Sequence, residues 1–231
     1  MIRDAGWRAH CIWEHSASLR DLYRRRCRRE AEEMTAHAQA AELLASLATP
    51  GDTLLDAGCG SGYFFHSIKS RNLGLVYYGI DAAPSLIAIG REELPRYGLP
   101  ADRLDVARLE DIEGDVDHVV CINVLSNIDN YHRPLDNLLK TAQKSVILRE
   151  SIKDRAEYRL VKDVYLDPGV DLSVYVNHYA LDEMIEFIAS RGFRARPVMD
   201  RRSGGQPELV IGYPHFWTFL VCEREKASYS I

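Results

Sequence analysis

The feature that most constrains the fold is a glycine-rich segment, residues 54–64, which reads Leu-Leu-Asp-Ala-Gly-Cys-Gly-Ser-Gly-Tyr-Phe. A short apolar stretch ends at Asp56, three glycines stand at alternate positions after it, and an aromatic, apolar stretch follows. Glycine readily adopts positive φ, so this order predicts a strand, a tight loop and the start of a helix. Such a loop presents backbone N–H groups and a helix N-terminus to a ligand, which predicts a site for a nucleoside-bearing cofactor.

The spacing of the glycines distinguishes this loop from two other nucleotide-binding loops. A dinucleotide-binding loop reads G-x-G-x-x-G, whereas Gly58, Gly60 and Gly62 give G-x-G-x-G. A phosphate-binding P-loop needs Gly-Lys followed by Ser or Thr, and the first lysine after these glycines is Lys69. The spacing therefore disfavours both of these loops.

A second acidic residue follows one strand–helix–strand unit later. Residues 76–81 read Val-Tyr-Tyr-Gly-Ile-Asp, another apolar stretch that ends in an acid, and Asp81 lies 25 residues after Asp56. The pattern D-x-G-x-G-x-G followed by this acid resembles the class I S-adenosylmethionine-dependent methyltransferases of the small-molecule type. The resemblance implies S-adenosylmethionine as cofactor, with the carboxylate of Asp81 accepting hydrogen bonds from both ribose hydroxyls.

The resemblance also implies which residues meet the cofactor at the ends of the predicted strands. Leu109 would supply a backbone contact and an apolar wall for adenine, although Arg108 stands where the family often has an acid. Asn123 ends an apolar strand, where its amide meets the cofactor or substrate or makes a structural hydrogen bond. The predicted cofactor-binding residues are Asp56, Ala57, Gly58, Cys59, Gly60, Gly62, Asp81, Ala82, Leu109 and Asn123.

Strand and helix patterns alternate along the chain, which predicts an α/β fold with a Rossmann-like, doubly wound sheet. The resemblance adds seven mostly parallel strands with an antiparallel last strand. Strands are expected at 53–57, 75–80, 103–107, 116–123, 144–150, 194–200 and 215–223. Helices are expected at 16–48, with a break near Thr35, and at 62–70, 84–94, 134–142 and 181–190. The expected single domain divides into an N-terminal helical cap (1–49), a cofactor-binding core (50–152), an insertion or lid (153–179) and a C-terminal helix and strand pair (180–231).

Composition narrows the class of protein. The 231 residues, 46% hydrophobic and 27% charged, are typical of a soluble globular domain. No apolar stretch approaches the ~20 residues of a membrane span, and no apolar signal segment follows Met1. The five cysteines are scattered, which favours a reduced, cytoplasmic setting without zinc. A net charge of −5 disfavours a nucleic-acid partner.

An arginine-rich stretch, residues 20–29, is an exception to this acidic balance. One interpretation is a solvated helix face whose cations pair with nearby acids such as Asp21, Glu30, Glu32 and Glu33. The other is a basic patch for RNA or an anionic substrate. The first interpretation is favoured, because the balancing acids follow within a turn or two.

Catalysis by such a cofactor needs little from the protein beyond orientation and desolvation, because a sulfonium methyl group is already activated. A general base is required only when the acceptor must lose a proton. His178, at the end of the insertion, and His215, between the last two strands, are the candidate bases, or else hydrogen-bonded residues of the surface or pocket wall. Glu150 is a further candidate base or a structural partner of Arg149 or Arg155. No metal is expected, because Asn123 and Glu150 stand where a metal-dependent, catechol-type enzyme has other ligands.

Aromatic residues in three segments, 13–30, 158–179 and 213–217, suggest a lid over a small organic substrate. A polar loop at 201–207 has the composition of a gate, where Arg201 and Arg202 meet an anionic group or are solvated. The sequence thus predicts methyl transfer to a small molecule, at oxygen or nitrogen. The alternatives are an RNA or protein methyltransferase, a catalytically inactive cofactor-binding subunit and, at the level of fold, a nicotinamide oxidoreductase. The acceptor and the oligomeric state cannot be deduced from any residue pattern.

Overall fold

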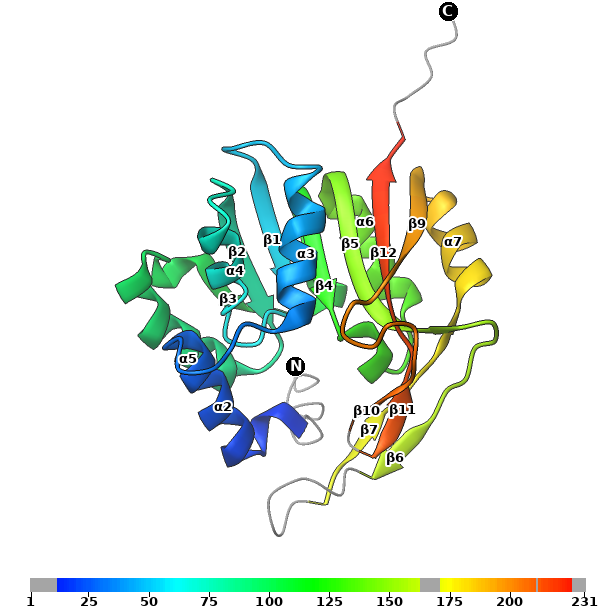
Figure 1. Cartoon of the computed structure of the whole chain (residues 1–231), viewed down its shortest axis with the longest axis horizontal. Coiled ribbons are helices and arrows are strands. Elements are labelled where there is room, and N and C mark those ends of the chain that lie inside the picture. Colours follow the sequence, from blue (N-terminus) through cyan, green and yellow to red (C-terminus); the bar gives the residue numbers. More distant parts are fainter. Residues whose placement is uncertain (1–11, 163–170, 211, 226–231) are drawn as a thin grey trace, which may run out of the picture.

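The computed structural model describes residues 12–162, 171–210 and 212–225, and a twisted sheet with helices on both faces forms its centre (Figure 1). The strands lie in the order β3-β2-β1-β4-β5-β12-β9, and β8 pairs with β5 outside this path. Their bounds are β1 Thr53–Ala57, β2 Val76–Asp81, β3 Leu104–Val106, β4 Val116–Ile122, β5 Ala142–Lys153, β8 Tyr179–Ala180, β9 Phe193–Met199 and β12 Trp217–Arg224.

Strand direction agrees with the predicted fold class. β1 pairs parallel with β2 and β4, β4 pairs parallel with β5, and the last strand β12 is antiparallel to β5 and β9. The predicted mostly parallel sheet with an antiparallel last strand is confirmed, and two-residue β8 adds an eighth strand. The strand order reverses between β1 and β4, which is where an open α/β sheet forms its ligand crevice.

Two apolar cores cover the two faces of the sheet. Successive residues of a strand point to opposite faces, so Leu54 packs in one core and Leu55 in the other. The first core includes residues of α3, α4 and α5, and the second includes residues of α6 and α7. The helices are α2 Ala17–Cys27, α3 Thr35–Ala45, α4 Phe65–Ser70, α5 Pro84–Glu93, α6 His132–Thr141 and α7 Leu181–Ala189.

Short 3-10 turns connect several of these elements. Their bounds are η1 Ile12–Glu14, η2 Leu94–Tyr97, η3 Ala101–Arg103, η4 Leu109–Asp111 and η5 Leu125–Asn127. Two of them, η4 and η5, follow directly after β3 and β4, so they stand at the carboxyl edge of the sheet. The residues that these turns contribute to the site are therefore fixed by the ends of the strands.

The N-terminal cap contains two helices rather than one long helix. The hydroxyl of Ser16 accepts a hydrogen bond from the backbone N–H of Leu19, so α2 begins directly after a side-chain cap. Residues 28–34 separate α2 from α3, so the break precedes Thr35 rather than following it. Residues 1–11, which belong to the predicted cap, lie outside the described residues. In the described part of the chain, no helix is long and apolar enough to cross a membrane.

The insertion contributes a two-stranded sheet of β6 (Leu160–Lys162) and β7 (Ser173–Tyr175), while residues 163–170 lie outside the described part. A second small sheet joins β10 (Glu208–Val210) to β11 (Tyr213–His215). Figure 1 shows both small sheets and α2 at the same lower edge of the main sheet. These elements of distant sequence therefore gather at one edge of the sheet.

In the loop at 201–207, both arginines are exposed and pair with carboxylates of the protein, which agrees with the solvated alternative. Arg201 forms an ion pair with Glu42, and the Nε of Arg202 lies 2.5 Å from Glu208. The backbone N–H of Ser203 donates to Asp200, which tightens the turn. Both guanidinium groups thus have carboxylate partners within the protein, because the loop folds back onto α3 and β10.

Candidate cofactor and substrate site

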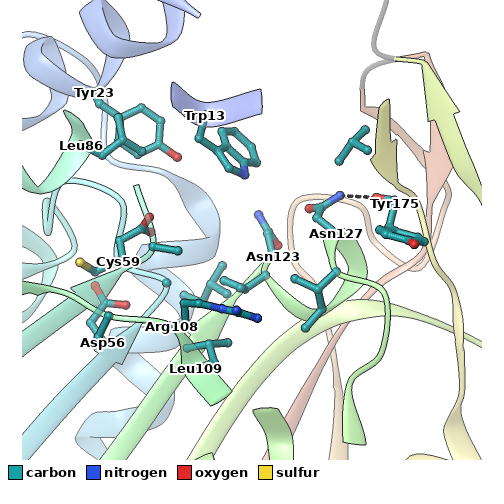
Figure 2. A pocket seen from close by; sticks show the side chains of 18 of the residues that line it. Trp13, Tyr23, Asp56, Cys59, Leu86, Arg108, Leu109, Asn123, Asn127 and Tyr175 are labelled. Carbon is teal, nitrogen blue, oxygen red and sulfur yellow. Dashed lines mark hydrogen bonds between the residues drawn. The ribbon is translucent and has the colours of Figure 1, made fainter. Parts of the chain in front are cut away.

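A cavity of about 770 Å³ lies beyond the carboxyl ends of β1, β2 and β4 (Figure 2). Its floor consists of strand-end residues, one wall comes from the N-terminal cap, and the opposite wall comes from η5 and the insertion. Seven of the ten predicted cofactor-binding residues line it, namely Asp56, Gly58, Cys59, Asp81, Ala82, Leu109 and Asn123. The other three, Ala57, Gly60 and Gly62, belong to the loop but are not among the described residues that line the cavity.

The loop after β1 requires glycine for two reasons. Gly58, Gly60 and Gly62 have φ values of +78°, +58° and +77°, in the left-handed region that side chains disfavour. A Cβ on Gly60 would also collide with the ring of Tyr23, which packs against the loop from α2. Glycine therefore permits both the turn and the close approach of the N-terminal cap.

Asp56, at the end of β1, is a buried carboxyl group on the floor of the cavity. The hydroxyl of Tyr77 on the neighbouring strand donates a hydrogen bond to it. Burial raises the pKa of Asp56 to about 7, while the hydrogen bond from Tyr77 opposes this shift and the nearby carboxylate of Asp81 adds to it. Asp56 is thus poised between its neutral and charged forms near neutral pH.

Asp81, at the end of β2, connects the glycine loop to the start of α5. One carboxylate oxygen accepts a hydrogen bond from the N–H of Gly60 at 2.7 Å, and the other accepts from the N–H of Ala83 at 2.8 Å. Burial raises the pKa of Asp81, and these two hydrogen bonds oppose the shift. Because a carboxylate oxygen can accept more than one hydrogen bond, Asp81 retains acceptor capacity on the side that lines the cavity.

The third strand leads into an apolar wall at η4. Leu109 lines the cavity and is 8% exposed, and its carbonyl accepts a hydrogen bond from the side chain of Asn137 at 3.2 Å. Arg108 also lines the cavity and lies 3.3 Å from the carboxylate of Glu110. The arrangement presents a flat apolar surface beside polar groups, which suits a heteroaromatic ring.

Asn123, directly after β4, has a backbone conformation that few residues adopt. Its φ is +60°, in the left-handed region where asparagine is tolerated better than most side chains. The guanidinium of buried Arg149 donates to the side-chain oxygen of Asn123 at 2.5 Å and, through Nε, to Asp200 at 2.7 Å. Because Arg149 occupies the oxygen, the amide nitrogen of Asn123 is directed into the cavity, as Figure 2 shows.

Glu150 is held by hydrogen bonds within the protein and is not among the described residues that line the cavity. Its carboxylate accepts hydrogen bonds from the N–H groups of Val124, Leu125 and Ser126, at 2.8–3.1 Å, and from the hydroxyl of Ser126. The side chain is fully buried, and burial raises its pKa to about 7 against the effect of these hydrogen bonds. The structure therefore assigns Glu150 to bracing the loop after β4, which corrects its interpretation as a candidate base.

The structure brings His178 and His215 together, with ring centroids 6.1 Å apart, but buries both. His178 shares a hydrogen bond of 2.7 Å with the hydroxyl of Ser151, and His215 stacks on Trp217 at 4.5 Å. Burial lowers the pKa of both imidazoles, that of His215 to about 4. Neither histidine is among the described residues that line the cavity.

Sequence reasoning missed most of the wall on the N-terminal side. Trp13 and Tyr23 were expected near the substrate, but the cavity is also lined by Arg26, Met34, His37 and Tyr63. The ring of His37 stacks on Tyr63 with centroids 4.6 Å apart, and burial lowers the pKa of His37 to about 3. Of these four residues, only Tyr63 had a local signal for a place in the site, because it directly follows Gly62 of the glycine loop.

The opposite wall joins the loop after β4 to the insertion. The side-chain amide of Asn127 donates to the carbonyl of Tyr175 at 2.9 Å, drawn as the dashed line in Figure 2. Asp129, Leu160 and residues 171–175 complete this wall. The insertion therefore borders the cavity as predicted. Further hydrogen bonds, including one from the N–H of Asn177 to the carbonyl of Ser126 at 2.9 Å, also attach it to η5.

Comparison with known proteins agrees with this geometry. Residues 55–146 match the family model of the methyltransferase domain. Magnesium protoporphyrin IX methyltransferase (ChlM) from Synechocystis PCC 6803, solved with bound SAM, is 18% identical, with a TM-score of 0.62 over 97% of this chain and 99% of that chain. The CcbJ methyltransferase from Streptomyces caelestis is 10% identical, with a TM-score of 0.61 over 94% of this chain and 99% of that chain.

A further similar structure is the glycopeptide N-methyltransferase MtfA complexed with SAM, 12% identical, with a TM-score of 0.56 over 82% of this chain and 94% of that chain. The comparison with curated proteins found no match. The family match covers the glycine loop, Asp81 and β4, and the fold agrees across nearly the whole chain. Residues 55–146 therefore match a methyltransferase domain, and the chain has the fold of S-adenosylmethionine-dependent methyltransferases. ChlM has also been solved with bound SAH.

Proposed function

We propose that the chain transfers the methyl group of S-adenosylmethionine to a small organic molecule, at oxygen or nitrogen. The observation that carries this proposal is the cavity of about 770 Å³, which has a wall on each side of the glycine loop and room for a small acceptor beside the cofactor. The cofactor supplies an activated methyl group, and the protein contributes orientation and exclusion of water.

The cofactor-binding residues follow from the floor of the cavity. Asp81 would accept hydrogen bonds from the ribose hydroxyls with its remaining lone pairs, and Leu109 would pack against adenine. Asp56, Gly58, Cys59 and Ala82 would line the path of the cofactor, and Asn123 would offer its amide N–H groups near the acceptor. Ala57, Gly60 and Gly62 would act through the shape of the loop, since their place is in its backbone and core.

We assign no proton-transfer role to His178 or His215. Both imidazoles lie among buried residues outside the described lining of the cavity, so a base role would require the insertion to rearrange. An acceptor that is an already deprotonated amine or an oxygen anion needs no base. Catalysis by positioning is therefore the mechanism that this geometry supports best.

Similar structures belong to methyltransferases with different acceptors. ChlM is a magnesium protoporphyrin IX methyltransferase, and MtfA is a glycopeptide N-methyltransferase. Because one fold accompanies both of these activities, the fold by itself does not select the acceptor. The comparison therefore supports the proposal at the level of a small organic molecule.

The four-part division of the chain and a cytoplasmic location remain predictions.

Two arginines of the stretch 20–29 pair with acids of the protein, which favours a small-molecule acceptor over the RNA alternative. Arg24 lies 2.8 Å from Glu93 and 2.6 Å from Glu92, and Arg28 lies 2.8 Å from Glu93. These arginines anchor α2 to α5, so their charge is largely neutralised within the protein. They pair with distant acids on α5 rather than with the nearby acids in sequence, which corrects the predicted partners.

Two measurements test the proposed function. Isothermal titration calorimetry should show binding of S-adenosylhomocysteine and no binding of NAD, and the reverse result would contradict the cofactor assignment. Transfer of radiolabel from S-adenosylmethionine to fractions of a cell extract should label a small-molecule fraction. Label only in RNA or protein would favour those acceptors, and tight cofactor binding with no transfer would favour an inactive partner subunit.

A further inference from the structure

Arg26 is a cation on the N-terminal wall of the cavity that is held by two tyrosines. Its guanidinium donates a hydrogen bond to the hydroxyl of Tyr63 at 2.9 Å. The guanidinium carbon lies 5.1 Å from the ring centroid of Tyr63 and 5.7 Å from that of Tyr23. These contacts fix the direction of the guanidinium group but leave its charge unneutralised.

Three other partly buried arginines near this wall have carboxylate partners. Arg24 of α2 and Arg28, directly after α2, share Glu93, and within the cavity Arg108 pairs with Glu110. No carboxylate of residues 12–162, 171–210 or 212–225 forms an ion pair with Arg26. A half-buried cation without a counter-ion is costly, so the site favours an anion from outside the chain.

Among the described residues, no charged side chain forms an ion pair with Arg26, and the polar groups around it are engaged elsewhere. Tyr63 donates its hydroxyl to the sulfur of Met34, and the low pKa of His37, about 3, keeps that imidazole neutral. The buried carboxyl of Asp56 is engaged by Tyr77, and burial favours its neutral form. An anion at this wall would thus meet one fixed cation in a partly apolar setting, where a charge-assisted hydrogen bond is strong.

We propose that Arg26 binds a carboxylate group of a ligand in the cavity, with Tyr23 and Tyr63 holding the guanidinium in place. The planar guanidinium can donate two parallel hydrogen bonds to a carboxylate. This inference rests on the proposed function, and the carboxylate has two possible sources. It belongs either to the amino-acid part of the cofactor or to the methyl acceptor.

The first test compares two nucleosides that differ in this carboxylate. S-adenosylhomocysteine carries the amino-acid part, and 5′-methylthioadenosine lacks it. Calorimetry with Arg26→Met should show a loss of about 10-fold to 100-fold in affinity for S-adenosylhomocysteine, with unchanged affinity for 5′-methylthioadenosine. Arg25→Met is the matched control, because Arg25 is the preceding residue on α2 and is exposed. Arg26→Lys should retain part of the affinity, which a role in packing alone would not predict.

The second test addresses the methyl acceptor. If Arg26→Met leaves both nucleoside affinities unchanged, benzoate is added to the protein saturated with S-adenosylhomocysteine. Benzoate should then raise the melting temperature of the wild type and of Arg25→Met but not of Arg26→Met. Unchanged nucleoside affinity together with an equal response of all variants to benzoate would overturn the inference. Failure of the wild type to bind either nucleoside would instead contradict the proposed function.

Discussion

Two loops at the carboxyl edge of the sheet are each held by a carboxylate, but only one of the two carboxylates lines the cavity. Asp81 accepts hydrogen bonds from two backbone N–H groups and still lines the cavity. Glu150 accepts from three backbone N–H groups and a hydroxyl, and it is fully buried. The difference shows that an acid near the end of a parallel strand is a ligand group only if its surroundings leave acceptor capacity facing the site.

The largest effect is expected from removing the fully buried brace. Glu150→Ala leaves the N–H groups of Val124, Leu125 and Ser126 without their acceptor, so urea unfolding should show a loss of about 3 kcal/mol or more. Glu183→Ala is the control, since Glu183 is exposed on α7 and should change stability by less than about 0.5 kcal/mol. Equal stability of the two variants would contradict the structural role of Glu150.

A side chain at Gly60 should lower cofactor affinity in addition to straining the backbone. Gly60→Val places a branched side chain at φ +58° and against Tyr23, whereas Gly204→Val has a similar φ of +56° with no atom within 4 Å. Strain should cost about 1–3 kcal/mol in both variants. Calorimetry should show that only Gly60→Val also loses affinity for S-adenosylhomocysteine. Full affinity in Gly60→Val would place the cofactor elsewhere.

The carboxylate that faces the cavity should affect binding directly. Asp81→Ala removes the expected ribose contacts and the acceptor for Gly60, so affinity for S-adenosylhomocysteine should fall by about 1–3 kcal/mol. Asp102→Ala removes an exposed carboxylate outside the described lining of the cavity and should bind normally. If both variants bind alike, Asp81 braces its loop as Glu150 does and contributes nothing to the ligand.

The most gradual expected effect is a dependence of stability on pH. Burial raises the pKa of Asp56 to about 7, so the folded state retains a proton that the unfolded chain releases near its ordinary pKa of about 4. Stability from this group is therefore fully present below about pH 4 and is lost as pH rises toward 7, by at most about 1.4 kcal/mol per pH unit.

Asp56→Asn separates this contribution from that of Glu150, whose pKa is also raised to about 7. Urea unfolding of Asp56→Asn between pH 4 and pH 8 should show a shallower decline than the wild type. Identical slopes would mean that Asp56 does not retain its proton in the folded protein. Glu150→Gln, measured over the same range, gives the contribution of the second carboxyl group.

Much of the fold and the floor of the site was predictable from the sequence. The period of the apolar residues located β1, β2, β4 and β5, and the glycine spacing located the loop between Asp56 and Gly62. These signals are local, because a strand, a tight turn and a helix start are set by residues within a few positions of one another. The bounds of β5 were too short, because pairing with β12 and β8 extends it to Lys153.

The remaining site residues depend on contacts between distant segments. His178 and His215 looked like pocket residues by their place in the chain, but packing buries them beside Ser151 and Trp217. Arg26 looked like one of several similar cations, and only the partners of Arg24 and Arg28 on α5 set it apart. Residue spacing cannot report such pairings, because they form only when the sheet brings the segments together.

The sequence by itself determined the glycine loop and the position of Asp81, on which the predicted methyl donor rests, because backbone conformation in a tight loop is dictated by the residues of the loop. Tertiary structure alone decided which polar groups face the cavity. Asp81 and Glu150 carry the same chemical group, and Arg26 and Arg24 differ by less than one helical turn in position. Asp81 and Arg26 line the cavity, whereas Glu150 and Arg24 make contacts within the protein. Burial and the available hydrogen-bond partners decide this difference, and both depend on packing between distant segments.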